Sequence, residues 1–225
     1  MLTWAVGVKP AAMNCSCLLQ GYAEGRYILP PLPYPDSAIE PLLSAEALYL
    51  HHDKHHAAYV VGANAALDAL RLINNGELSP QQAPSVSQNL AFNLGGHILH
   101  TLYWENICPT ERHEPTGDLA LAILRDFGSY AAFEQLFLTV SLAVQGSGWG
   151  VLGLDPMSHR LMVTGIRRHQ DVLVPGFCPL LVCDVWEHAY YLNWRNDRKG
   201  YLYSFMQHIN WNIVEQRYEK ARCYE

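Results

Sequence analysis

The chain has 225 residues, of which 50% are hydrophobic, 11% aromatic and 16% charged. This composition is typical of a globular protein and excludes disordered and collagen-like chains. Lys and Arg number 15 against 21 Asp and Glu, a net charge of -6, so the chain lacks the basic excess that nucleic-acid binding requires. No apolar run approaches the roughly 18 residues of a membrane span. We therefore expect no nucleic-acid partner and no membrane partner.

The N-terminal residues 1–26 are interpreted as a poorly specified extension. They contain one Lys, one Arg and one Glu, which is too little positive charge for a transit peptide, and they lack the order of a signal peptide. The six cysteines show no CxxC spacing, which favours a reducing compartment. These features predict a cytoplasmic protein.

The first folded unit is expected over residues 27–108. Four prolines between positions 30 and 35 favour an extended lead-in, because proline is excluded from helix interiors. Ser44 is a plausible N-cap for a long helix over residues 45–74, with a bend expected at Gly62. A second helix is predicted to start at residue 85 or 87 and to end near 106. Two long helices with a short connection predict an antiparallel hairpin.

A polar segment at 109–118, rich in charges and containing prolines, marks the expected boundary with a second unit over 118–225. The elements predicted after it are helices at 119–126 and 130–144, a β-hairpin of strands 146–155 and 160–166, a buried strand at 179–186, and helical sequence from 187 to 221.

Histidine is unusually frequent, with 11 copies, four of them in the motif HHDKHH. On a helix this spacing puts His51 and His55 on one face, with Tyr59 one turn beyond, and His52 and His56 on the adjacent face. Two imidazoles on one face can meet a metal ion. Taken alone, the motif is equally typical of a solvated basic face.

Two further groups of histidine and carboxylate residues favour a metal site over a solvated face. The motif GGHILH brings His97 and His100 close together on the second helix, and DVWEH carries Asp184 and His188 four residues apart. Imidazoles and a carboxylate from three separate elements suit a mononuclear, redox-capable Mn or Fe ion. The motifs of a zinc protease, a di-iron bundle, a P-loop and a dinucleotide site are missing from the sequence.

These motifs resemble those of the iron/manganese superoxide dismutase family over nearly the whole chain. The matching strings are LPPLPYPDSAIEP, LHHDKHHAAYVVGANAAL, FNLGGHILHTLYWEN, FGSYAAFEQLF, GSGWGVL, DVWEHAYYLNWRNDR and INWNIVEQRY. The resemblance implies an α+β fold, in which an N-terminal antiparallel helical hairpin precedes a C-terminal α/β domain with a three-stranded antiparallel sheet. The metal would lie between the two.

The resemblance also implies one Mn or Fe ion per subunit. Its four protein ligands would be His51, His100 rather than His97, Asp184 and His188. A solvent molecule would complete the coordination sphere.

Further family positions surround this site. They fall on the substrate-channel pair His55 and Tyr59, the aromatic walls Trp149 and Trp186, Arg198 near the channel mouth, and the cross-subunit residues Glu187 and Tyr191. The last two imply a homodimer or homotetramer.

One position is left open between two residues. Some iron enzymes of the family carry Gln four residues before the second ligand, where this chain has Gly96. The group that sets the redox potential of the metal is therefore expected on the sheet, as His169 or Gln170. A hydrogen bond from such a residue to metal-bound solvent shifts the redox potential.

The function implied is superoxide dismutase, in which two superoxide anions and two protons become O2 and H2O2 through alternating oxidation and reduction of the metal. The alternative is a metal-binding relative without turnover. The sequence departs from the family pattern at Leu99, Lys199-Gly200 and Met206, and none of these is an implied ligand.

Overall fold

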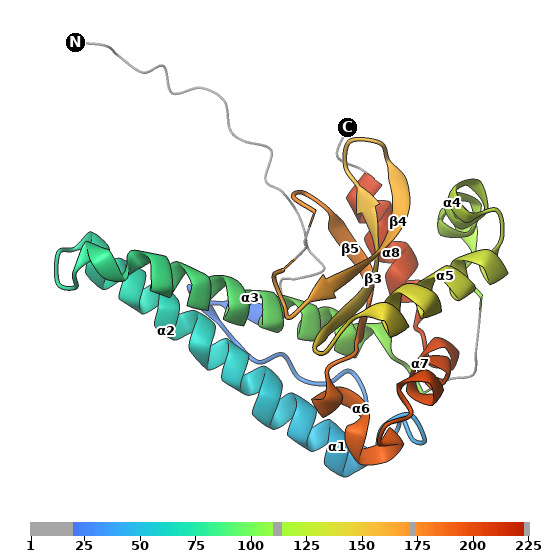
Figure 1. Cartoon of the computed structure of the whole chain (residues 1–225), viewed down its shortest axis with the longest axis horizontal. Helices are drawn as coiled ribbons and strands as arrows, with labels where there is room; N and C mark the ends of the chain where they lie inside the picture. Colours follow the sequence, from blue (N-terminus) through green and yellow to red (C-terminus); the bar gives the residue numbers. More distant parts are fainter. Residues whose placement is uncertain (1–19, 110–113, 172–173, 223–225) are drawn as a thin grey trace, which may run out of the picture.

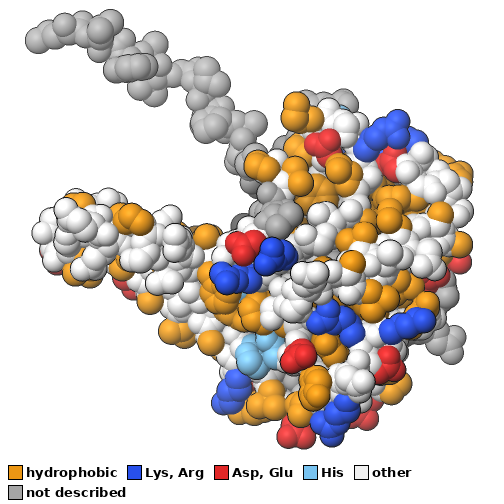
Figure 2. Space-filling model, viewed as in Figure 1, with side chains coloured by type: hydrophobic (Ala, Val, Ile, Leu, Met, Phe, Trp, Pro, Cys, Tyr) orange, Lys and Arg blue, Asp and Glu red, His pale blue; other side chains and the backbone are white. Residues whose placement is uncertain are grey.

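The computed structural model describes residues 20–109, 114–171 and 174–222. Figure 1 shows a long helical hairpin projecting from an α/β part in which helices surround a small sheet. In the space-filling view the tip of the hairpin extends from the main body as an arm (Figure 2). This arrangement confirms the α+β fold that the sequence predicts.

The first arm of the hairpin consists of three helical segments without a break between them. They are α1 (Ala45–Tyr49), the π-helix η2 (Leu50–His56) and α2 (Ala57–Asn74). The side chain of Ser44 accepts a hydrogen bond from the backbone N–H of Ala47 and caps α1, as predicted. The π-helix was not predicted, and it lies within the HHDKHH motif.

The second arm starts earlier than predicted. A short 3-10 helix, η3 (Pro80–Gln82), leads directly into α3 (Ala83–Asn106). Proline is tolerated there because the first N–H groups of a helix have no helical partner. Helix α2 continues without interruption through Gly62, where a bend is expected, and a Cβ atom there would collide with the side chain of Asn93. Gly62 therefore permits the close approach of the two arms.

A two-stranded hairpin precedes these helices. It comprises β1 (Tyr22–Ala23) and β2 (Arg26–Tyr27), and residues 1–19 of the expected extension lie outside the described residues. The side chain of Asn64 on α2 bonds both the backbone N–H and the carbonyl of Tyr27, at 3.0 and 2.8 Å. Arg26 forms an ion pair with Asp68 at 2.8 Å. Residues 20–27 are thus attached to the first arm.

The C-terminal part contains the remaining helices and the larger sheet. Its elements are α4 (Gly117–Phe127), α5 (Tyr130–Ala143), β3 (Gly148–Asp155), β4 (Arg160–Arg167), β5 (Cys178–Asp184), α6 (Glu187–Trp194), α7 (Arg198–Gln207) and α8 (Trp211–Arg222). The strands form an antiparallel sheet in the order β4-β3-β5, so the predicted three-stranded sheet is confirmed.

The central strand β3 positions one side of the functional site. Seven of its eight residues are buried, because α5 packs on the sheet and β4 and β5 flank the strand (Figure 1). The register pairs Trp149 with Asp184 of β5. Helix α3 packs beside β5, so the inner end of the hairpin meets the C-terminal end of β5.

The sequence from 187 to 221 forms three helices rather than a continuous stretch. Helix α6 ends at Arg195, whose φ of 52° is incompatible with a right-handed helix. Helix α8 is joined to α3 by the buried guanidinium of Arg217, which donates to the carboxylate of Glu105 at 2.6 Å and also to the side chain of Asn106. None of the helices formed by the described residues combines the length and apolar character needed to cross a bilayer.

Candidate metal centre

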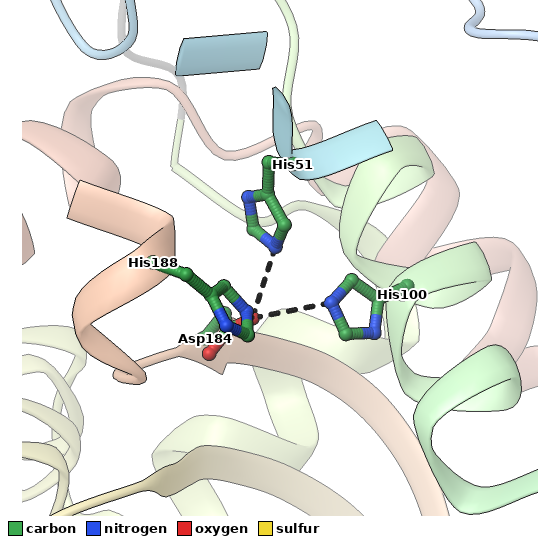
Figure 3. A group of neighbouring side chains, drawn as sticks. All are labelled: His51, His100, Asp184 and His188. Carbon is green, nitrogen blue, oxygen red and sulfur yellow. Dashed lines mark hydrogen bonds and ion pairs between the residues drawn. The ribbon is translucent and has the colours of Figure 1, made fainter. Parts of the chain in front are cut away.

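Four side chains from four elements converge where the hairpin meets the C-terminal part (Figure 3). His51 comes from η2, His100 from α3, Asp184 from the end of β5 and His188 from α6. The Nε2 atoms of His51, His100 and His188 lie 3.1, 3.4 and 3.2 Å, respectively, from Oδ2 of Asp184. The four candidate ligand atoms all lie within 4.8 Å of one another.

The π-helix determines which histidines of HHDKHH turn inward. In this wider turn the N–H of Ala57 bonds to the carbonyl of His52, five residues earlier. His51, His52 and His56 are all buried, whereas His55 is exposed. His51 and His55, expected on one face of the helix, therefore differ in exposure. The ring of His55 nevertheless stacks on that of His188, with 4.3 Å between the ring centroids.

The protonation states fit a metal ion. Burial lowers the pKa of His51 to about 4 and that of His100 well below its ordinary value, so these rings are neutral at physiological pH. Burial would raise the pKa of Asp184, but the neighbouring His188 and His51 lower it below its ordinary value. Neutral imidazole and ionised carboxylate are the forms that bind metal.

The tautomer of His100 supports the same conclusion. Its Nδ1 lies 2.7 Å from the carbonyl of Gly96, which can only accept, so the proton is on Nδ1. Its Nε2 is buried without a hydrogen-bond partner and directs a lone pair into the cluster. Three imidazole nitrogens and a carboxylate oxygen form a donor set that suits Mn or Fe.

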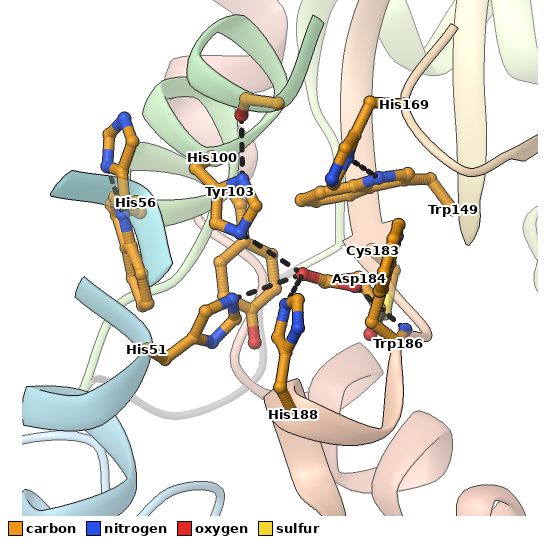
Figure 4. Close-up of polar contacts among 12 residues, drawn as sticks. His51, His56, His100, Tyr103, Trp149, His169, Cys183, Asp184, Trp186 and His188 are labelled. Carbon is orange, nitrogen blue, oxygen red and sulfur yellow. Dashed lines mark hydrogen bonds and ion pairs between the residues drawn. The ribbon is translucent and has the colours of Figure 1, made fainter. Parts of the chain in front are cut away.

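An aromatic wall encloses the cluster (Figure 4). The ring of Trp149 lies 4.9 Å from that of His100, and Trp186 stacks on His188 at 5.3 Å. Tyr59, 9% exposed, lies 5.1 Å from His100. Trp149, Trp186 and Tyr59 thus lie around the four candidate ligands, and their expected roles at a metal stay predictions.

His169 and Gln170 occupy different environments. The indole Nε1 of Trp149 donates to Nδ1 of His169 at 3.1 Å, so the neutral ring carries its proton on Nε2, which is buried without a partner. Burial lowers the pKa of His169 to about 4. The ring lies 4.6 Å from that of Tyr59. In contrast, Oε1 of Gln170 accepts from the backbone N–H of His169 at 3.3 Å.

The remaining sequence-based candidates lie further out. Arg198 donates to the carbonyls of Val144 and Gly146 at 2.7 and 2.9 Å and to the hydroxyl of Tyr190. Glu187 and Tyr191 are on the exposed side of α6. Their expected roles at the channel mouth and across an interface stay predictions.

The sequence interpretation missed several rings at the site. The ring of Trp104 lies 4.7 Å and that of Tyr103 5.4 Å from the candidate ligand His51, and Phe92 lies 4.9 Å from the outer-sphere candidate His169. Tyr103 and Trp104 follow His100 by three and four residues, so helical periodicity alone would place them beside it. That signal was available in the string HILHTLYW.

The fold and donor set define a mononuclear, redox-metal oxidoreductase, and comparison with known proteins identifies its family. Residues 26–108 match the alpha-hairpin domain of iron/manganese superoxide dismutases, and residues 115–217 match their C-terminal domain. The chain belongs to the iron/manganese superoxide dismutase family. Its activity is therefore superoxide dismutation, and its metal is manganese or iron.

Named relatives agree with this assignment. The chain is 42% identical to the Mn/Fe superoxide dismutase of Aeropyrum pernix over 198 residues, which cover 87% of this chain and 92% of the relative. The Fe enzyme of Pyrobaculum aerophilum is 42% identical over 198 residues, with coverages of 87% and 93%. The Mn enzyme of Nocardia asteroides is 42% identical over 196 residues, with coverages of 87% and 94%.

Proposed function

We propose that His51, His100, Asp184 and His188 hold the single Mn or Fe ion on which superoxide dismutation depends. The observation that carries this assignment is the convergence of three Nε2 atoms on one buried carboxylate oxygen, at 3.1 to 3.4 Å. When bound, the ion takes an electron from one superoxide and gives it to the next, so that O2 and H2O2 form in turn.

Tyr59 and His169 are proposed to present O–H and N–H donors beside the candidate ligands. Burial and the nearby Asp184 raise the pKa of Tyr59 above its ordinary value, so its hydroxyl is protonated at physiological pH and can donate a hydrogen bond to a bound anion. His169 offers an unpartnered Nε2–H beside Tyr59. We assign the outer-sphere role to His169 rather than Gln170, because the buried ring of His169 lies 5.8 Å from that of the candidate ligand His100 and its Nε2–H is free to donate.

Access to the site is proposed to pass beside His55. Its exposed ring stacks on His188 at 4.3 Å, so it links the surface to the candidate ligands. Lys54 is exposed next to it and supplies positive charge that attracts an anion in an otherwise acidic protein. Arg198 is oriented by two backbone carbonyls, and we propose that it contributes to the same local potential.

We also propose a homodimer or homotetramer in the cytoplasm. Glu187 and Tyr191 are exposed on α6, next to the ligand His188. Contact with a second copy through this helix would cover them close to the site. The cytoplasmic assignment rests on the spacing of the cysteines, which shows no CxxC pattern.

The test is to load the protein with Mn or Fe, measure bound metal, and follow superoxide decay by pulse radiolysis. We expect His188→Gln to lose metal and catalysed decay together. His208→Gln is the control, because His208 follows the last residue of α7 and is outside the candidate ligand group, and its Nδ1 bonds to the carbonyl of Ser204. Full metal retention by His188→Gln would contradict the ligand set. Wild-type protein with one ion per chain but no catalysed decay would support the metal-binding relative without turnover.

A further inference from the structure

Besides His169, three buried histidines have no part in the candidate ligand set. His52 and His56 belong to HHDKHH and His97 to GGHILH, and all three are at most 6% exposed. His52 is 2.9 Å from the carbonyl of Pro30, which is an ordinary structural contact. His56 and His97 instead bond to each other.

These two rings form the centre of a continuous hydrogen-bonded chain. The indole Nε1 of Trp104 lies 3.1 Å from Nδ1 of His56. Nε2 of His56 lies 2.8 Å from Nδ1 of His97, and Nε2 of His97 lies 2.9 Å from the carbonyl oxygen of Gly21. We call this the histidine chain; its members are Trp104, His56, His97 and Gly21.

The two ends of the histidine chain determine every proton position in it. An indole N–H can only donate and a carbonyl oxygen can only accept. Each imidazole therefore accepts at Nδ1 and donates at Nε2. The donor at one end and the acceptor at the other end require the same tautomers. Burial lowers the pKa of His56 to about 2 and also lowers that of His97, so both rings are neutral. Because the indole does not release its proton, the chain holds positions and does not conduct protons.

The inner half of the chain packs behind two candidate ligands. The ring of His56 stacks on His100 with 5.3 Å between centroids and 23° between planes. The ring of Trp104 meets His51 edge-on at 4.7 Å. Figure 4 shows His56 on the opposite side of His100 from Trp149 and His169. The histidine chain thus supports the ligands on the side away from the outer-sphere residues.

The outer end of the chain is the backbone just before β1. A Cβ atom on residue 21 would lie 2.7 Å from Nε2 of His97, so only glycine permits this approach. The strands that follow are held to α2 by Asn64 and by the Arg26–Asp68 ion pair. Gly21 therefore connects the N-terminal hairpin to the histidine chain at a sterically selected point, beside the ring of Tyr27, which lies 5.5 Å from that of His97.

We propose that His97 is a positioning residue: through His56 and Trp104 it fixes the orientation of His51 and His100 and couples that orientation to the N-terminal hairpin at Gly21. This inference rests on the proposed ligand set. Without His97, the Nε2–H of His56 loses its acceptor in a buried region, and the carbonyl of Gly21 keeps only its bond from the backbone N–H of Ile28. The His56 ring can then turn, and the ligand His100 that it stacks on loses its support.

The test measures metal release from the loaded full-length protein. Variants are first checked for one bound Mn ion per chain and then mixed with EDTA, and the EPR spectrum of bound Mn(II) reports ligand geometry. Removing a hydrogen-bonding partner of a metal ligand typically changes metal affinity by about 10- to 100-fold. His97 acts on the ligands through His56, so we expect the lower end of this range, with Mn released about tenfold faster from His97→Leu and an altered spectrum. His97→Gln keeps an acceptor and a donor, and it should restore most of the loss.

Two further variants separate positioning from general stability. Thr101→Val removes a buried hydrogen bond from the same helix, since Thr101 Oγ1 donates to the carbonyl of His97 at 2.9 Å, but it leaves the histidine chain intact. We expect a lower Tm with the wild-type release rate and spectrum. Gly21→Ala perturbs the chain from its far end and should accelerate release in the same direction as His97→Leu.

The outcomes are distinct. If His97→Leu releases Mn at the wild-type rate with the wild-type spectrum, the proposal is overturned. It is also overturned if Thr101→Val accelerates Mn release as much as His97→Leu, because His97 would then have a merely structural role. If His97→Leu does not fold, Gly21→Ala decides, and unchanged release from it overturns the proposal. A fully loaded His100→Ala variant would instead refute the ligand set, and with it the proposed function.

Discussion

Replacing His169 by alanine tests whether this residue sets the reduction potential of the metal without being needed to bind it. The variant removes the unpartnered Nε2–H beside Tyr59 and the acceptor for the Trp149 indole, but none of the four candidate ligands. We expect stoichiometric metal with impaired turnover. Gln170→Ala is the matched control, because it removes the neighbouring side chain, whose oxygen is bound to the backbone N–H of His169.

The magnitude follows from the bond that His169 offers. A hydrogen bond to a charged acceptor contributes about 1.5 to 3 kcal/mol. If it forms in only one oxidation state, that free energy appears in the reduction potential at about 59 mV per 1.4 kcal/mol, which gives a shift of about 60 to 130 mV. The metal-free variant should also lose about 1 to 3 kcal/mol of unfolding free energy, since a buried indole N–H is left without an acceptor.

Potentiometric titration and pulse radiolysis at matched metal loading provide the measurement. The reasoning is refuted if His169→Ala stays within about 20 mV of wild type while its fold is intact, a shift too small for a lost charged hydrogen bond. A larger shift in Gln170→Ala than in His169→Ala would move the outer-sphere role to the amide.

Other expectations follow from the same structure. His100→Ala should abolish stoichiometric metal retention and His97→Ala should not, by metal analysis; the reverse would exchange the two assignments. Sedimentation at micromolar concentration should show at least a dimer, and a fully active monomer would contradict it. The pKa values of His51 and His169, lowered to about 4, mean that the unfolded chain binds protons that the native chain excludes. Stability of the metal-free protein should therefore fall as pH drops from about 7 to 4, by up to about 3 kcal/mol per ring in denaturant titrations. Arg217→Met should lower the unfolding free energy by about 3 kcal/mol, because it leaves the partly buried carboxylate of Glu105 and the buried side chain of Asn106 without the guanidinium that they bond; an unchanged value would refute this.

The sequence predicted the elements well and their ends less well. Helical periodicity and the cap at Ser44 located the hairpin, and turn residues located the β3–β4 hairpin. The start of α3 was predicted too late, because Pro80 and Pro84 were interpreted as loop residues although proline is favoured in the first turn of a helix.

The site was harder to predict where tertiary packing decides local geometry. Spacing rules for an α-helix cannot show that residues 50–56 form a π-helix, which buries His56 and leaves His55 exposed. The choice between His169 and Gln170 depends on Arg168, whose φ of 52° orients the chain after β4, and on the Trp149 indole. Neither is visible in the sequence alone.

Gly96 couples the helix backbone to the position of Tyr59. A Cβ atom at residue 96 would lie 2.9 to 3.1 Å from three carbons of the Tyr59 ring, and that ring lies 5.1 Å from the ring of His100. Any side chain at residue 96, a glutamine included, therefore requires the Tyr59 ring to shift. In this chain a donor placed on the helix would alter the position of the Tyr59 hydroxyl beside the candidate ligands, whereas a donor placed on the sheet leaves that hydroxyl where it is.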